Sequence, residues 1–79
     1  MFVEILSPSL GGEDGAAILS SWLVTIGEKV QKGQAIANIE TNKALISYES
    51  EFDGVIFEIK VTEGSEISDL HLIAIIEVS

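Results

Sequence analysis

Short apolar runs alternate with turn-forming residues along the whole of this chain. The runs are rich in β-branched and aromatic residues, and glycine, asparagine, aspartate or serine separates most of them. No window keeps the i, i+3, i+4, i+7 apolar spacing long enough to predict a helix. The pattern therefore predicts an all-β domain, either a sandwich or a flattened barrel. Six strands are expected, over residues 1–6, 16–24, 34–41, 44–50, 55–61 and 70–78.

The two halves of the sequence resemble each other. The matching pairs are VTIGEKV (24–30) with VTEGSEI (61–67) and AIANIE (35–40) with LIAIIE (72–77), both 37 residues apart, and DGAAI (14–18) with DGVIF (53–57), 39 residues apart. Two copies, each with one apolar face, can bury those faces against each other. In that arrangement the hairpin between the halves and the two chain termini lie at opposite ends of the domain.

A lysine stands at the junction of the two halves. The segment ETNKA (40–44) predicts a tight hairpin turn, because asparagine tolerates turn conformations. At such a tip Lys43 projects into solvent, and the acidic residues Glu40 and Glu49 favour its charged form. A catalytic lysine needs burial or cationic neighbours instead. The pattern favours a lysine that another enzyme modifies, and the alternative is an ordinary solvated turn residue.

Composition narrows the function classes. The 79 residues predict one small domain over 1–79, and the net charge of −9 argues against nucleic acid as a partner. Absence of cysteine excludes disulfides and thiolate metal sites and fits a reducing compartment, so a cytoplasmic location is expected. The longest apolar run, LIAII (72–76), is too short to cross a membrane. His71 is the only histidine and a weak metal candidate, and no set of nucleophile, base and acid predicts catalysis by this chain alone.

Several motifs together resemble one family. They are SPSLGG (7–12), Trp22, Gly27, VQKG (30–33), IETNKA (39–44) and Gly54-Val55. The chain is similar over nearly its whole length to the lipoyl domain of the acyltransferase (E2) component of 2-oxo acid dehydrogenase complexes. The resemblance implies a barrel-sandwich hybrid, a flattened barrel of two four-stranded antiparallel sheets with quasi-twofold symmetry. It also implies that Lys43 carries lipoic acid in amide linkage, with Thr41, Asn42 and Ala44 as the turn and recognition context.

That resemblance implies a swinging-arm carrier that does not itself catalyse. The expected partners are the 2-oxo acid dehydrogenase (E1), dihydrolipoamide dehydrogenase (E3) and the lipoyl-attaching enzyme, in the cytoplasm or, in a eukaryote, the mitochondrial matrix. The family usually has Asp-Lys-Ala where this chain has Asn42-Lys43-Ala44, and Ala17 stands where a glycine is common. Two alternatives share the fold. One is a biotin carboxyl carrier, whose lysine usually lies between methionines, and the other is an unmodified interaction module.

Overall fold

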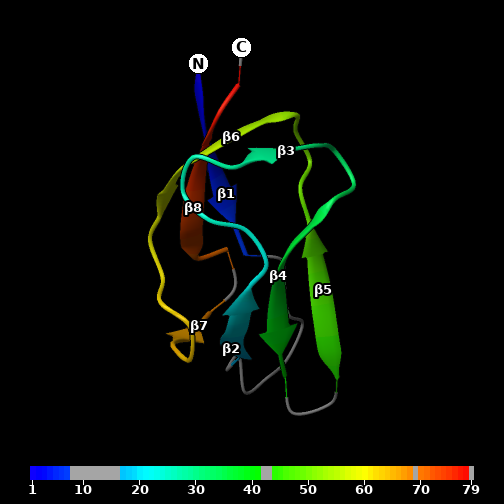
Figure 1. Ribbon diagram of the computed structural model, residues 1–79. Helices are drawn as coiled ribbons and strands as arrows, with labels where there is room; N and C mark the ends of the chain where they lie inside the picture. The colour runs from blue at the N-terminus through cyan, green and yellow to red at the C-terminus, as the bar shows by residue number, and fades with distance from the viewer. Residues whose placement is uncertain (8–16, 42–43, 69, 79) are drawn as a thin grey trace.

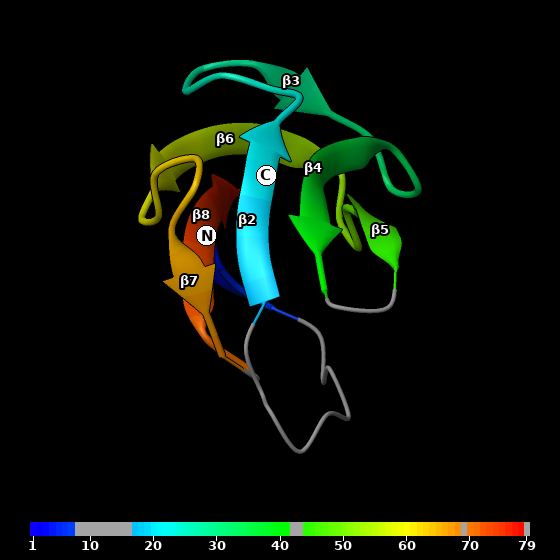
Figure 2. The same ribbon diagram turned by 90° about the horizontal axis from the view of Figure 1, so that it is seen from below.

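Eight β-strands form two four-stranded antiparallel sheets in a computed structural model that describes residues 1–7, 17–41, 44–68 and 70–78 (Figure 1). One sheet has the strand order β1-β8-β6-β3 and the other β5-β4-β2-β7, and the second order can be followed in the view turned by 90° (Figure 2). The strands are β1 Phe2–Leu6, β2 Ala17–Trp22, β3 Lys29–Val30, β4 Ala35–Glu40, β5 Leu45–Glu49, β6 Gly54–Ile59, β7 Glu66–Ile67 and β8 Leu72–Glu77. The predicted all-β class and the pair of four-stranded sheets are confirmed. None of the described residues lies in a helix that could span a membrane.

The core lies between the sheets and is built from alternate residues of the longer strands. Side chains on a strand alternate between its two faces, so each strand sends one set inward. Leu19, Ile39, Ile56 and Ile76 are fully buried at the centre. Half-buried side chains, among them Trp22, pack around this core. The apolar runs of the sequence are therefore explained by one shared core between two sheets.

The internal repeat appears in the strand pairing. In one half Leu19 pairs with Ile39, and 37 residues later Ile56 pairs with Ile76. Both strand pairs also carry a register shift at the equivalent place, between Leu19 and Ser21 and between Ile56 and Glu58. Such a shift marks an inserted residue that bends the strand. The predicted quasi-twofold symmetry is therefore confirmed, and it includes the register shifts of the two strand pairs.

One detail of the predicted repeat is wrong. The sequence match between 14–18 and 53–57 gave an offset of 39 residues, but the strands follow the offset of 37. Ala17 pairs with Ile67 as Gly54 pairs with Val30, so Ala17 and Gly54 are equivalent. The Asp-Gly match was misleading, because the register of a strand is fixed by which of its side chains face the core and not by a local identity of sequence.

The chain termini and the central hairpin lie at opposite ends of the molecule, as the repeat predicted (Figure 1). The amino group of Met1 donates to the Val78 carbonyl at 3.0 Å, and the Val78 N–H donates to the Met1 carbonyl at 2.7 Å. These bonds extend the β1–β8 pairing to the end of the sheet. At the far end β4 finishes at Glu40 and β5 begins at Leu45. Any extension at the termini therefore starts far from the hairpin.

Candidate functional site

The candidate site is the hairpin that joins β4 to β5. Glu40 pairs with Leu45, and one step further from the tip Ile39 pairs with Ile46. The Thr41 N–H donates to the Ala44 carbonyl at 2.8 Å, which closes the turn. The two residues between them, Asn42 and Lys43, lie outside the described residues, so the roles predicted for them stay predictions.

Thr41 fastens the base of this turn with its side chain as well. Its hydroxyl Oγ1 accepts a hydrogen bond from the Ala44 N–H at 3.0 Å and lies 3.1 Å from the Ala44 carbonyl, to which it can donate. Threonine hydroxyls commonly bond nearby backbone in this way and favour turns. The sequence predicted Thr41 only as part of the turn and recognition context. Its position three residues before Ala44 was the signal for the closing role.

The strands behind the turn are held firmly by the core. Ile39 is fully buried on β4, and Ile46 of β5 packs against the buried cluster. In contrast, Glu40, Ala44 and Leu45 are exposed, and Leu45 keeps 64% of its surface accessible. The described flanks thus form a rigid stem with an exposed end. Such a stem suits a lysine that a second enzyme must reach and that then carries a covalently attached group.

Most charged side chains on the described surface are carboxylates that form no ion pair with a described residue. The one ion pair between described residues joins Lys60 to Glu58 at 2.8 Å, on β6 and just past it, away from the hairpin. Within the described ranges no group of three or more His, Cys, Asp or Glu residues could hold a metal ion. His71 lies on the surface, where its backbone N–H donates to the Ser7 hydroxyl at 2.9 Å.

Trp22 has a structural role at the end of β2, next to β4 in the sheet. Its indole Nε1 donates to the Val61 carbonyl at 2.8 Å, and its ring packs against the core. Its backbone N–H donates to the Glu63 carboxylate at 2.8 Å. The bond from Nε1 links β2 to the loop after β6, so this tryptophan ties one sheet to the other.

We expect the Thr41→Val variant to be a poorer substrate for the lysine-modifying enzyme. Valine keeps the shape of threonine but removes both contacts of the hydroxyl with Ala44, which together stabilise the turn by about 1 kcal/mol. A looser turn lowers the fraction of molecules that present Lys43 in the recognised geometry, so kcat/KM for modification should fall about fivefold. Intact-mass time courses with a lipoyl ligase measure this. Equal rates for Thr41→Val and wild type would contradict the closing role.

Comparisons with known proteins agree with this geometry. Residues 3–76 match the biotin and lipoyl family model, described as a biotin-requiring enzyme. A dihydrolipoyllysine-residue acetyltransferase component of the pyruvate dehydrogenase complex from Zymomonas mobilis is 39% identical over 66 residues, 84% of this chain and 15% of that protein. The E1 component subunit beta of pyruvate dehydrogenase from Rhizobium meliloti is 41% identical over 84% of this chain and 14% of that protein.

A solved structure is similar over almost the full length of both chains. The lipoyl domain of the 2-oxoglutarate dehydrogenase complex from Azotobacter vinelandii has a TM-score of 0.80 and 28% identity, and the match covers 96% of each chain. This chain spans only about a seventh of the two relatives' lengths, so the activities in their names are those of longer proteins. The chain belongs to the family of biotinyl and lipoyl carrier domains, and within it is similar to the lipoyl domains of 2-oxo acid dehydrogenase complexes.

Proposed function

We propose that Lys43 carries lipoic acid in amide linkage and that the domain shuttles acyl groups between the active sites of a 2-oxo acid dehydrogenase complex. The main support is the hairpin closed by Thr41 and Ala44, which leaves only Asn42 and Lys43 between its ends. Family membership adds the second support, because members carry a covalent cofactor of the biotin or lipoate class. The solved lipoyl domain favours lipoate of the two.

In this function the protein presents the cofactor and does not perform the chemistry. When bound, lipoate supplies a disulfide ring that takes up an acyl group together with reducing equivalents. The chain contributes the rigid stem of β4 and β5, which holds the attachment point away from the core. Attachment to a domain within a complex raises the effective concentration of the carried group at each active site, into the mM range for a short tether. The proposed partners are therefore E1, E3 and the lipoyl-attaching enzyme.

The acidic surface fits a carrier that must visit several enzymes. A net charge of −9 keeps copies of the domain from associating with one another and attracts basic surfaces over several ångströms. Residues flanking the turn contribute to this field, since Glu40 is exposed at the end of β4. Exposed charges of this kind change association rates more than they change final affinity.

The ligase that modifies the chain decides between lipoate and biotin. We expect the purified chain to gain the mass of one lipoyl group when incubated with a lipoyl ligase, ATP and lipoate, and to gain no mass with a biotin ligase, ATP and biotin. The reason is that Asn42 and Ala44 flank Lys43, where biotinyl domains usually have methionines. Intact-mass spectrometry reads both reactions. A gain only with biotin would replace lipoate by biotin, and no gain with either ligase would leave an unmodified interaction module.

A further inference from the structure

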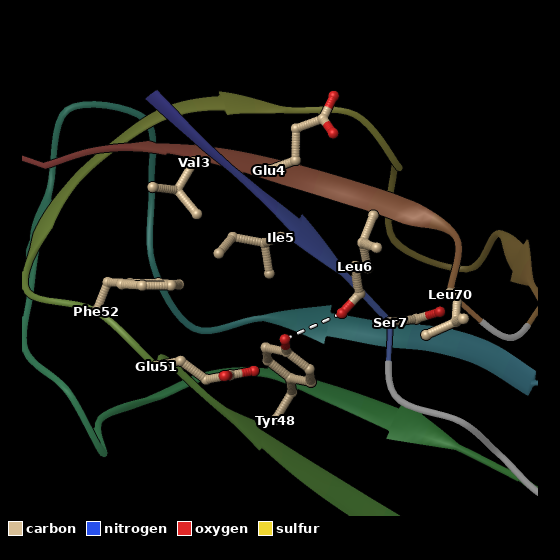
Figure 3. A pocket seen from close by; sticks show the side chains of 9 residues that line it. All are labelled: Val3, Glu4, Ile5, Leu6, Ser7, Tyr48, Glu51, Phe52 and Leu70. Atoms are coloured by element: carbon tan, nitrogen blue, oxygen red, sulfur yellow. Dashed lines mark hydrogen bonds between the residues drawn. The ribbon is translucent and has the colours of Figure 1, made fainter. Parts of the chain in front are cut away.

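A groove opens on one side of the barrel, where the edge strand of each sheet is exposed. It has a volume of about 380 Å³ and is lined by β1 on one side and by Tyr48 of β5 on the other (Figure 3). Phe52 lies at one end of the groove, and Leu6 and Leu70 lie at the other. We call this feature the β1–β5 groove. Its walls are mostly apolar although they face solvent, which is the usual character of a binding surface.

The backbone at Leu70 is the second observation. Leu70 has a φ of 56°, and among the described residues that are not glycine it is the only one with positive φ. At an offset of 37 residues its counterpart in the first half is Gly33, with a φ of 88°. The fold therefore accepts glycine at this turn, and a leucine in the left-handed region costs about 1–2 kcal/mol. Strained residues of this kind concentrate where proteins bind ligands.

The strain brings no compensating burial within the domain. Leu70 keeps 63% of its surface exposed, and Leu6 beside it keeps 40% exposed. A leucine placed for the fold would bury its side chain, as Leu19 does. The pair instead forms an apolar end wall that the domain leaves open to solvent. Leu70 thus combines a strained backbone with a side chain that gains little burial in return.

The charges at the groove indicate what kind of partner fits. Glu51 is exposed beside Tyr48, Glu4 is exposed on β1 and points away from the groove (Figure 3), and no lysine or arginine is among the described residues that line it. Burial raises the pKa of the Tyr48 phenol above its ordinary value, and the Glu51 carboxylate raises it further. Tyr48 therefore stays neutral at physiological pH and donates its O–H to the Leu6 carbonyl at 3.0 Å. A second copy of this chain, also at −9, is disfavoured by charge repulsion.

We propose that the β1–β5 groove docks a protein partner that inserts an apolar side chain against Leu6 and Leu70 and places a lysine or arginine on Glu51. The inference rests on the proposed function for the identity of that partner, which is an enzyme that acts on the carried group. Contacts with apolar side chains supply affinity, and Glu51 supplies orientation and association rate. Docking there uses an edge of the barrel rather than the hairpin itself, so the attachment site stays free to enter an active site.

The decisive variant is Leu70→Gly. It removes the exposed side chain and at the same time gives position 70 the residue found at its counterpart, so the fold should be at least as stable as wild type. If leucine is there for a partner, affinity should fall about tenfold while the urea midpoint stays equal or rises. A purely structural role for Leu70 predicts lower stability and unchanged binding.

Binding is measured on the unlipoylated chain with purified E1 and purified E3 of the source organism, each tested separately by calorimetry. Ile26→Ser is the matched control, because Ile26 is 61% exposed and lies outside the groove, and its affinity should stay within about twofold of wild type. In stopped-flow mixing, Glu51→Gln should slow association several-fold at low salt and have little effect at high salt. The inference is supported if Leu70→Gly weakens binding to either enzyme.

The inference is overturned if neither enzyme binds the wild type, or if Leu70→Gly binds both as tightly as wild type. These outcomes are separate from those that test the proposed function, because the binding assay uses protein without lipoate. A chain that gains the lipoyl mass but shows no effect of Leu70→Gly would retain the carrier function and lose only the groove. A chain that gains no mass but binds through the groove would lose the carrier function.

Discussion

The Lys43→Ala variant should gain no lipoyl mass under conditions in which the wild-type chain is fully modified. In the proposed function the lipoyl amide requires a primary amine at one defined place, between Thr41 and Ala44 of the hairpin. Lys43→Arg should fail as well, since a guanidinium keeps the charge but does not form the amide. Both variants should unfold within about 0.5 kcal/mol of wild type, the usual range for surface substitutions. Intact mass and urea unfolding measure the two expectations.

Lys32→Ala provides the matched control for this loss. Lys32 is an exposed lysine in the turn between β3 and β4, and its backbone N–H donates to the Asp53 carboxylate at 2.7 Å. Replacing its side chain should leave the lipoyl mass gain unchanged, because we expect the ligase to recognise the geometry of the β4–β5 turn and not to modify every exposed lysine. Persistence of the mass gain in Lys43→Ala would show that another lysine is the acceptor and would refute the assignment.

The sequence predicted those parts of the fold that depend on long apolar runs. The six longer strands each contain enough alternating residues to show which face is buried, and all six are confirmed. The family resemblance implied eight strands, but the apolar pattern did not locate the two short ones, β3 and β7, because two residues have no measurable period. Both lie within the two similar segments VTIGEKV (24–30) and VTEGSEI (61–67). The similarity of these segments did not indicate which strands they pair with. The repeat therefore predicted that the two halves fold alike, but it did not locate the short strands within each half.

The site could be predicted only in part. The location of the hairpin followed from two apolar runs around a polar turn, and the ends of β4 and β5 confirm it. The closing role of the Thr41 hydroxyl was missed, since its position three residues before Ala44 is a signal that many sequences share. The β1–β5 groove was not foreseen at all. It is lined by residues from both halves of the chain, such as Leu6 and Leu70, and no local sequence pattern predicts that these residues lie close together.

The Gly54→Ala variant should lose about 2–3 kcal/mol of unfolding free energy, the largest stability effect that we expect. A Cβ at position 54 would lie 2.7 Å from Cγ2 of Ile76 and 3.1 Å from Cγ1 of Val78, and closer still to the backbone carbonyl of Glu77. The carbonyl belongs to strand β8 in the middle of its sheet, so it cannot move without breaking the pairing with β1. The urea midpoint should fall with little change in the slope m.

The quasi-twofold repeat supplies the control for this variant. Ala17 is the counterpart of Gly54, and its Cβ is accommodated there with 2% of the residue exposed. Ala17→Gly should therefore cost only about 1 kcal/mol, from lost packing and added freedom in the unfolded chain. Unequal effects at equivalent positions would show that the two halves differ where β6 approaches the C-terminal end of β8. Equal, small effects at both positions would contradict the close approach, because the sheet at Gly54 would then have the room that the sheet at Ala17 has.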